Sequence, residues 1–270
     1  GNTWLRALLC SYYYSENGTF DQKLLRKIDQ FPQKRYYSNF NYDQTIVTDT
    51  SKFWIKAQEK INLDKKVKFF KTHNILGGLN GNQFTDSKNT IGSIYIVRDP
   101  RNVITSLKNH YEINNSEALE FMLNKNKYIY DYHTKNDYSD FQLISSWENN
   151  YRSWKNQKNI PVKFIKYEDL YIKTYDVFKD LIEFINMTCK IKNKFNKGKA
   201  QNAIYSSSFD NLKSIENKNG FSESVLSKTG TKKIAFFNLG PKNNWRKIYD
   251  RSYLEKLNFI FKDNLKEIKY

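Results

Sequence analysis

The chain is poor in cysteine, glycine and proline, and it has no long apolar run. Its 270 residues include 2 Cys, 10 Gly and 4 Pro, and the scarcity of glycine and proline argues against long flexible linkers. Cys10 and Cys189 lie in no Cys-x-x-Cys pair and beside no histidines at metal-binding spacing, so a disulfide framework is not expected. This cysteine usage favours a reducing compartment, and we predict a cytoplasmic location. No segment approaches the roughly 20 apolar residues that cross a bilayer, so no membrane span is predicted.

Aromatic and basic residues are abundant instead. Apolar residues make up 39% of the chain and aromatic residues 16%, which is typical of a folded protein rather than a disordered one. The formal net charge of +17 suits a polyanionic partner, but it also fits the compositional drift of an AT-rich coding sequence. The densest basic clusters, 64–68 and 190–199, lack regularly interleaved aromatic residues. Nucleic acid is therefore not predicted as a partner.

Hydrophobic periodicity predicts short strands that alternate with helices. Asp99 is a suitable N-cap, and Pro100 a suitable first residue, for a helix after the second strand. Such alternation indicates an α/β fold, a parallel sheet flanked by helices, and no boundary divides the single domain of residues 1–270. The predicted strands are 66–73, 91–97 and 161–170, and the other predicted helices are 3–14, 21–31, 51–62, 116–127, 140–157, 177–185 and 251–265.

Polar residues follow the predicted strands at the points where the strands stop. They are KTH at 71–73, RDP at 98–100 and YED at 167–169, and GNTW at 1–4 opens the first predicted helix. Ligands of open parallel sheets bind beyond the carboxyl ends of the strands, so we expect these segments to form one site.

Two of these segments have the chemistry of an anion site. The backbone amides of residues 1–4 would converge at a helix N-terminus, where the helix dipole favours phosphate. Arg98 ends a strand, and a fixed guanidinium can bind phosphate with two N–H groups. Ser106 follows eight residues later, about two helical turns along, where its hydroxyl can share the same anion.

His73 is the candidate for acid–base chemistry. A neutral imidazole after a strand, flanked by Lys71, could accept a proton from a substrate hydroxyl. His110, late in a helix, and His133, in a predicted loop, are interpreted as structural.

Together, in this order and spacing, these motifs resemble the PAPS-dependent sulfotransferase family, whose donor is 3′-phosphoadenosine 5′-phosphosulfate (PAPS). The phosphosulfate loop of that family reads like PKSGTTW, and this sequence starts at GNTW. The resemblance therefore implies a P-loop-like nucleotide-binding fold, here truncated within the loop, with the first strand and the Pro-Lys-Ser of the loop missing.

The resemblance also implies roles for individual residues. His73 would remove the acceptor proton, and Lys71 would support the sulfuryl oxygens as charge develops. Residues 1–4 would hold the 5′-phosphosulfate, Arg98 and Ser106 the 3′-phosphate, and no metal would be required. The full set of donor-binding residues that it implies is Gly1, Asn2, Thr3, Trp4, Arg98, Ser106, Tyr167, Ser207, Ser208, Phe209, Leu212 and Gly240, with Phe209 packed on the adenine and Tyr167 nearby.

One segment departs from the family pattern. Near the C-terminus the family commonly has Arg-Lys-Gly before a tryptophan, and the Arg binds the 3′-phosphate. Gly240 and Trp245 keep their places here, but Asn238 and Leu239 stand where the cations belong. Lys242 and Lys233 are candidates to replace them.

The function implied is sulfuryl transfer to a hydroxyl or amine of a small-molecule or glycan acceptor, with desulfated PAP as product; a homodimer is left open. A P-loop kinase is the main alternative, but it needs Gly-x-x-x-x-Gly-Lys-[Ser/Thr], and Asn2 follows Gly1. A basic nucleic-acid-binding protein would need clustered cations with aromatic residues or a known module. A third alternative is an inactive fragment, because the donor loop is incomplete.

Overall fold

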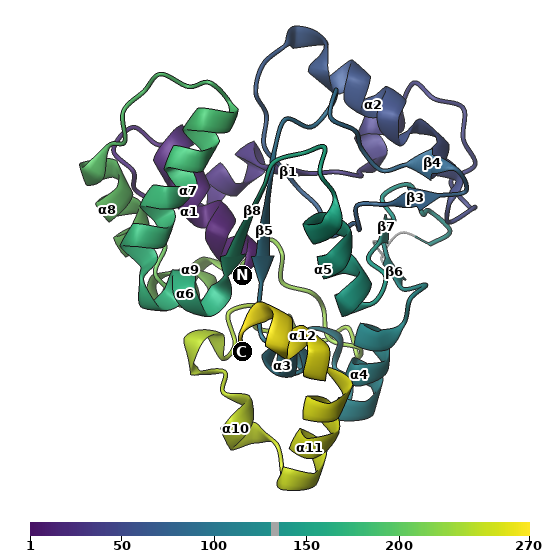
Figure 1. Cartoon of the computed structure of the whole chain (residues 1–270), viewed down its shortest axis with the longest axis vertical. Coiled ribbons are helices and arrows are strands. Elements are labelled where there is room, and N and C mark those ends of the chain that lie inside the picture. Colours follow the sequence, from purple (N-terminus) through teal and green to yellow (C-terminus); the bar gives the residue numbers. More distant parts are fainter. Residues whose placement is uncertain (131–134) are drawn as a thin grey trace.

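A computed structural model describes residues 1–130 and 135–270 of the chain, so His133 lies outside the described residues. Figure 1 shows a few central strands with helices on both sides and a further group of helices below them. α1, α6, α7, α8 and α9 cover one side of β5 and β8, while α3, α4, α10, α11 and α12 gather beyond the arrowheads of these strands. The start of the chain lies at the same end of the strands.

The described residues form helices of both the α and the 3₁₀ type. The α-helices are α1 (Asn2–Tyr14), α2 (Trp54–Ile61), α3 (Pro100–Tyr111), α4 (Asn115–Leu123), α5 (Trp147–Asn156), α6 (Tyr167–Ile172), α7 (Thr174–Thr188), α8 (Lys197–Ser206), α9 (Phe209–Asn219), α10 (Trp245–Ile248), α11 (Arg251–Ile260) and α12 (Lys262–Ile268). The 3₁₀ helices are η1 (Gln22–Lys27), η2 (Lys34–Tyr37), η3 (Asp49–Phe53), η4 (Asn62–Asp64) and η5 (Gly240–Lys242).

The strands of the described residues pair in four two-stranded units, two of them parallel. In the longer parallel pair, Ser93 to Val97 of β5 lie opposite Val162 to Lys166 of β8. Parallel strands between helices agree with the predicted α/β class, although the strand predicted at 66–73 shortens to two residues. The parallel pairs are β1 (Asp29–Gln30) with β2 (Phe70–Lys71) and β5 (Ser93–Val97) with β8 (Val162–Lys166); the antiparallel pairs are β3 (Gly78–Leu79) with β4 (Asn82–Gln83) and β6 (Tyr128–Ile129) with β7 (Gln142–Leu143).

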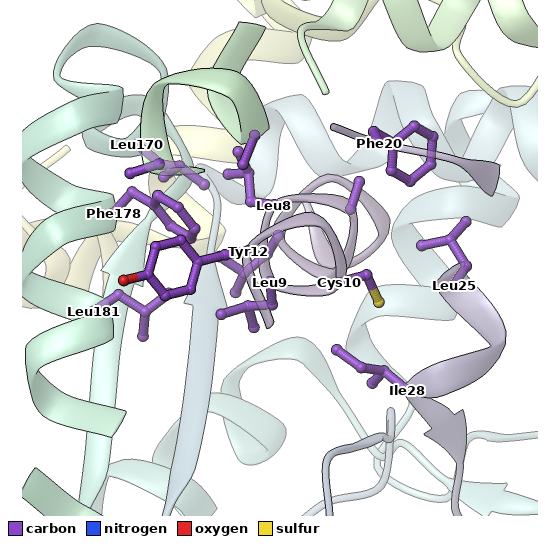
Figure 2. Close-up of a cluster of buried hydrophobic side chains, with 14 of the residues drawn as sticks. Leu8, Leu9, Cys10, Tyr12, Phe20, Leu25, Ile28, Leu170, Phe178 and Leu181 are labelled. Atoms are coloured by element: carbon purple, nitrogen blue, oxygen red, sulfur yellow. The ribbon is translucent and has the colours of Figure 1, made fainter. Parts of the chain in front are cut away.

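Helix α1 lies at the centre of the largest hydrophobic core (Figure 2). Leu8 and Cys10 are fully buried, and they pack in one cluster with Phe178 and Leu181 of α7. Burial raises the pKa of the Cys10 thiol to about 12, although Arg6 opposes the shift, so Cys10 packs as a small neutral hydrophobe. This packing fixes the direction of α1 and therefore the position of its first turn.

Two of the predicted helices are wrong. Residues 140–157 were expected to be one helix, but Gln142 and Leu143 form β7, and α5 begins only at Trp147. The helix cannot extend further back, because Ser145 has φ +56° and the Ser146 side chain caps α5 by accepting from the Asn149 amide.

The second wrong prediction concerns residues 21–31. Asp21 accepts from the Lys23 amide and starts the 3₁₀ helix η1, and the chain then extends at Ile28 to form β1 beside β2. Tertiary pairing with β2 therefore overrides an apolar spacing that suits a helix.

Candidate active site

The predicted site residues share one cavity of about 1740 Å³, where α1 begins and the parallel strands end. Ser207 is the exception: it is fully buried, and its hydroxyl lies 3.4 Å from that of Ser11 in α1. The predicted residues that line the cavity are Gly1, Asn2, Thr3, Trp4, Lys71, His73, Arg98, Ser106, Tyr167, Ser208, Phe209, Leu212 and Gly240.

The first turn of α1 closes one end of this cavity. Gly1 is the N-cap, and the amides of the first turn have no carbonyl partner inside the helix. A Cβ at Gly1 would lie 2.6 Å from Cδ1 of Ile96, so a larger residue at the start of the helix would have to displace the Ile96 side chain. The Thr3 hydroxyl donates to the Glu223 carboxylate at 2.9 Å.

A buried ionic cluster joins α1 to β2. Lys71 Nζ lies 2.8 Å from Oε1 of Glu223, and Arg6 Nη1 lies 2.5 Å from the same oxygen. Arg6 Nη2 also donates to the carbonyls of Leu25 and Ile28, at 3.1 Å each. The cluster therefore ties the start of α1, the end of η1 and the end of β2 to one carboxylate.

The pKa values of Glu223 and Lys71 both lie below their ordinary values, for different reasons. Burial alone would raise the pKa of Glu223, but Lys71 and Arg6 outweigh it and lower the pKa to about 2. Burial also lowers the pKa of Lys71, and Glu223 only partly offsets that effect. Both directions follow from the same geometry, because one carboxylate has two cations while Lys71 shares its carboxylate with Arg6.

His73 follows β2 and faces the cavity. Its backbone N–H donates to Oε1 of Gln142 at 2.7 Å, and its carbonyl accepts from Nδ2 of Asn150 at 3.0 Å. Its side chain is open to the cavity but lies within protein walls. The loss of bulk solvent, and then the charge of Lys71, lower the pKa of the imidazole, which is therefore neutral at pH 7.

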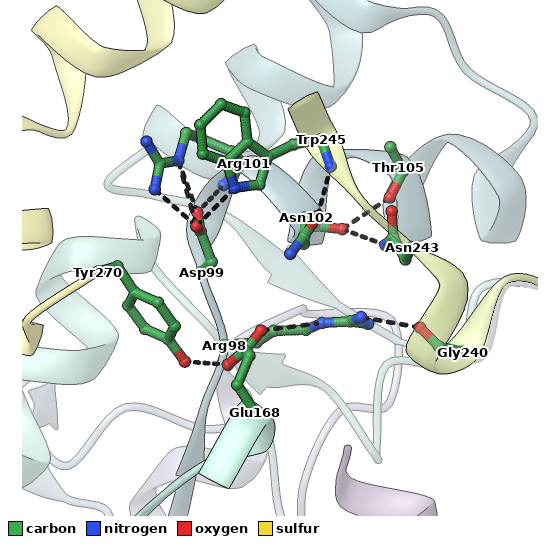
Figure 3. Close-up of polar contacts among 10 residues, drawn as sticks. All are labelled: Arg98, Asp99, Arg101, Asn102, Thr105, Glu168, Gly240, Asn243, Trp245 and Tyr270. Atoms are coloured by element: carbon green, nitrogen blue, oxygen red, sulfur yellow. Dashed lines mark hydrogen bonds and ion pairs between the residues drawn. The ribbon is translucent and has the colours of Figure 1, made fainter. Parts of the chain in front are cut away.

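Arg98 follows β5 and lines the same cavity. Figure 3 shows its side chain between Glu168 and the Gly240 carbonyl. Its Nη2 donates to the Gly240 carbonyl at 2.9 Å, and its guanidinium lies 4.0 Å from the centre of the Tyr167 ring. Nε lies 3.6 Å from a Glu168 oxygen, too far for a hydrogen bond, and is a buried donor with no hydrogen-bond partner. Ser106 of α3 is exposed and lines the same cavity.

The residues after Arg98 hold the segment that carries Gly240. Asp99 caps α3 by accepting from the Arg101 amide, and one of its oxygens lies 2.9 Å from Nε1 of Trp245. The Trp245 amide donates to Oδ1 of Asn102 at 3.0 Å, and the Arg101 guanidinium lies 3.9 Å from the centre of the Trp245 ring. Figure 3 shows this clamp beside Arg98.

The start of α9 forms another wall. Ser208 is its N-cap, and Phe209 is partly buried in its first turn. A Cβ at Gly240 would lie 2.1 Å from the Phe209 ring, so the glycine permits a close approach of the two segments. Lys213 of α9 donates to the carbonyl of Asn238 at 3.2 Å.

Several residues at the site escaped the sequence analysis. Arg6 could have been found, because it lies three residues after Thr3 on the same face of α1. Glu223 carries no local signal, since its partners Arg6 and Lys71 are distant in sequence. Glu168 belongs to the YED segment, but its pairing with Arg98 was not predicted. Lys233 and Lys242, the proposed substitutes for the family cations, do not line the cavity, and the structure instead brings Lys213 to Asn238.

Residues 1–130 and 135–270 contain no group of three or more His, Cys, Asp or Glu side chains arranged to hold a metal ion. Within the same residues, no helix has both the length and the apolar character to span a membrane.

This cavity, with cationic side chains and a helix N-terminus at the ends of parallel strands, defines a nucleotide-binding α/β enzyme. The chain matches the family model of the sulfotransferase domain over residues 1–269, and it belongs to this family. The predictions of the family and of a sulfotransferase are therefore confirmed. No curated protein matches the chain significantly.

Two solved structures resemble the fold. Mouse sulfotransferase SULT7A1, complexed with PAP, is 19% identical with a TM-score of 0.50, and the match covers 77% of this chain and 70% of that one. Retinol dehydratase, in complex with androsterone and the inactive cofactor PAP, is 15% identical with a TM-score of 0.59, and the match covers 98% and 78%. The predicted α/β sulfotransferase fold is confirmed by this likeness.

Proposed function

We propose that the chain transfers a sulfuryl group from PAPS to a hydroxyl or amine of an acceptor and releases PAP. A single observation carries the proposal: the first turn of α1 and Arg98 contribute two anion-binding features to the same cavity that Lys71 and His73 line. Both of the similar solved structures contain PAP, a nucleotide with two phosphate groups.

The residues present suit such a donor. Arg98 has an unused buried Nε–H, and Ser106 offers an exposed hydroxyl, so the two can bind a 3′-phosphate. The free amides of the α1 first turn and the Thr3 hydroxyl suit the 5′ end of the nucleotide. Phe209 and Tyr167 supply aromatic surface for the adenine.

The chemistry assigned to the protein is proton transfer and charge stabilisation. The donor supplies an activated sulfuryl group, which moves to the acceptor oxygen as the bond to the 5′-phosphate breaks. The neutral imidazole of His73 accepts the acceptor's proton. The ammonium of Lys71 stabilises negative charge that develops on the transferred group and on the leaving phosphate.

The identity of the acceptor, the cellular location and the oligomeric state are further parts of the proposal. Cavity walls near His73 include Tyr130, Trp147 and Trp154, which suits a small molecule or glycan with an apolar face. A cytoplasmic location and a homodimer remain predictions.

Titration of the purified chain with PAP tests the proposal directly. We expect PAP to raise the Tm and to bind in calorimetry, whereas ATP with Mg²⁺ and duplex DNA do not. Arg98→Ala removes charged hydrogen bonds and should weaken PAP binding by roughly 10-fold or more. An unchanged affinity for PAP in this variant would remove Arg98 from the site.

The same protein, with PAPS and a panel of hydroxylated acceptors, tests the role of His73. His73→Ala should lower the transfer rate by about 10²–10⁴-fold and leave PAP affinity unchanged, because the imidazole acts on the acceptor. Turnover of the variant at the wild-type rate would contradict the assignment. Tighter binding of ATP than of PAP would favour the kinase alternative.

A further inference from the structure

Three donors from different parts of the chain converge on the carboxylate of Glu223. They are the Thr3 hydroxyl at 2.9 Å, Arg6 Nη1 at 2.5 Å and Lys71 Nζ at 2.8 Å. The side chains of Arg6, Lys71 and Glu223 are 8%, 16% and 21% exposed, so the contacts are largely shielded from water. Such shielding strengthens charge-assisted hydrogen bonds.

Arg6 is held by contacts besides Glu223, and the backbones of Lys71 and Thr3 are fixed by the elements that carry them. Two carbonyls of the η1 region hold the Arg6 guanidinium, and Arg6 Nε is buried with no hydrogen-bond partner. Lys71 belongs to β2, which pairs with β1, and Thr3 belongs to the buried first turn of α1. These three side chains therefore form a preformed cradle with donors to spare.

A carboxylate matches this cradle incompletely. Its single negative charge faces two cations and the positive end of α1, whereas a sulfuryl or phosphoryl group brings more negative charge or more acceptor oxygens. Glu223 and the cavity-lining residues Thr3, Arg6 and Lys71 all border the space beside His73. An anionic group that enters this space competes with the Glu223 carboxylate for the same donors.

We propose that Glu223 is a built-in competitor for the anion site formed by Thr3, Arg6 and Lys71: its carboxylate fills the site in the free protein and swings out when an anionic group of the donor enters. This inference rests on the proposed function, because it assigns the cradle to the 5′ end of the donor nucleotide.

The neighbours of Glu223 allow its side chain to leave while the backbone stays. Phe221 is buried, and the centre of its ring lies 4.9 Å from the ring centre of Phe236 and 5.0 Å from that of Phe237. The Ser224 hydroxyl donates to Glu216 at 2.8 Å. A tethered carboxylate competes at a high effective concentration. The apparent Kd for a free anion therefore equals the Kd of the open cradle divided by the fraction of molecules in which the cradle is open.

Glu223→Gln tests the proposal, with Glu216→Gln as the matched control. Both changes remove one negative charge from the same part of the chain, but Glu216 accepts from the Ser224 hydroxyl and the amides of Phe236 and Phe237, and no cation of the cradle contacts it. The probes are PAP in calorimetry and inorganic sulfate in thermal shift, with chloride holding the ionic strength constant.

We expect Glu223→Gln to lower the Tm of the protein without ligand. The variant should also bind both probes roughly 10-fold more tightly, which corresponds to a cradle that is open in about a tenth of wild-type molecules. Glu216→Gln should show no gain in affinity. Equal or weaker binding of both probes by Glu223→Gln overturns the proposal and makes the cluster purely structural. An equal gain in both variants also overturns it, because the cause would then be net charge.

Glu223→Asp guards against a Glu223→Gln variant that does not fold. Aspartate keeps the charge but is one methylene shorter, so it cannot reach all three donors, and a smaller gain of the same sign is expected. Failure of the proposed function can be told apart from failure of this inference. In the first case the wild-type protein would not bind PAP, but the Glu223 variants would still bind sulfate more tightly than the wild type.

Discussion

At the residue scale, His73 shows how position changes the chemistry of a common side chain. The imidazole faces the cavity, yet protein walls and the charge of Lys71 disfavour its protonated form. A base that is neutral at pH 7 needs no prior deprotonation, which suits the removal of an acceptor proton. The sequence motif supplied the residue, and the surroundings supplied the protonation state.

This setting predicts the titration of His73 in the free protein. Its pKa lies below the ordinary value of 6.5, so the imidazole should stay neutral as the pH falls through 6.5 and protonate only further down, toward about 4. Lys71→Gln removes one cause of the shift and should move the pKa upward. Nitrogen-detected NMR of the histidine side chains, assigned with His73→Ala, measures both values. Titration of wild-type His73 at or above 6.5 would contradict the prediction.

At the element scale, the start of α3 and the start of α10 act as one clamp. Asp99, Arg101 and Asn102 of the first element bind Trp245 of the second, and the segment between them carries Gly240 to Arg98 (Figure 3). The clamp holds the Gly240 carbonyl, which is one of three contacts of the Arg98 guanidinium, together with Tyr167 and Glu168.

Removal of one hydrogen bond tests the clamp. Trp245→Phe keeps the ring but deletes the donor to Asp99, and we expect a loss of about 1–3 kcal/mol in the free energy of unfolding. PAP affinity should fall roughly 5-fold, equivalent to about 1 kcal/mol. Trp154→Phe is the control, because it loses a similar bond to the Asn74 carbonyl away from Arg98. Urea unfolding and calorimetry provide the two readouts, and equal PAP affinities in the two variants would argue against the clamp.

At the scale of the whole molecule, α1 serves both the core and the site. Its apolar face contributes Leu8, Leu9 and Cys10 to the largest core cluster, and its first turn closes the cavity (Figure 2). The stability of the fold and the binding of the donor therefore both depend on α1. A substitution that weakens the packing of α1 should lower the free energy of unfolding of the whole protein.

Leu8→Ala measures this dependence. Leu8 is fully buried, so the substitution should reduce the free energy of unfolding by about 2–5 kcal/mol through lost burial and the cavity left behind. Phe259→Ala removes a larger side chain that is 81% exposed and should change it by less than about 0.5 kcal/mol. Urea denaturation followed by tryptophan fluorescence compares them, and similar losses in both variants would contradict the central role of α1.

Local signals predicted much of this molecule. The helix start at Asp99 and Pro100 is confirmed, because a cap and a first-turn proline act within a few residues. The predicted helix at 3–14 and the strand at 91–97 are also found, at nearly the expected bounds. The helices predicted at 140–157 and 21–31 are wrong because strand pairing decided part of each segment: Gln142 and Leu143 pair with β6, and Asp29 and Gln30 pair with β2.

The sequence predicted most residues of the candidate site but not the contacts between them. Residues 1–4 and 71–73 line one cavity together with Arg98, the first residue of the 98–100 motif, while Ser207 turns into the core. The roles of these residues, and the single domain of residues 1–270, stay predictions.

By itself, the sequence determined the family and the side chains at the strand ends, because these depend on short motifs and on the register of apolar residues. Only the tertiary structure decided which charges meet. Glu223 reaches Arg6 and Lys71, and Glu168 reaches Arg98, across gaps in the chain that no spacing rule connects. Electrostatic interactions act through space, so the state of the site depends on the fold that brings its charges together.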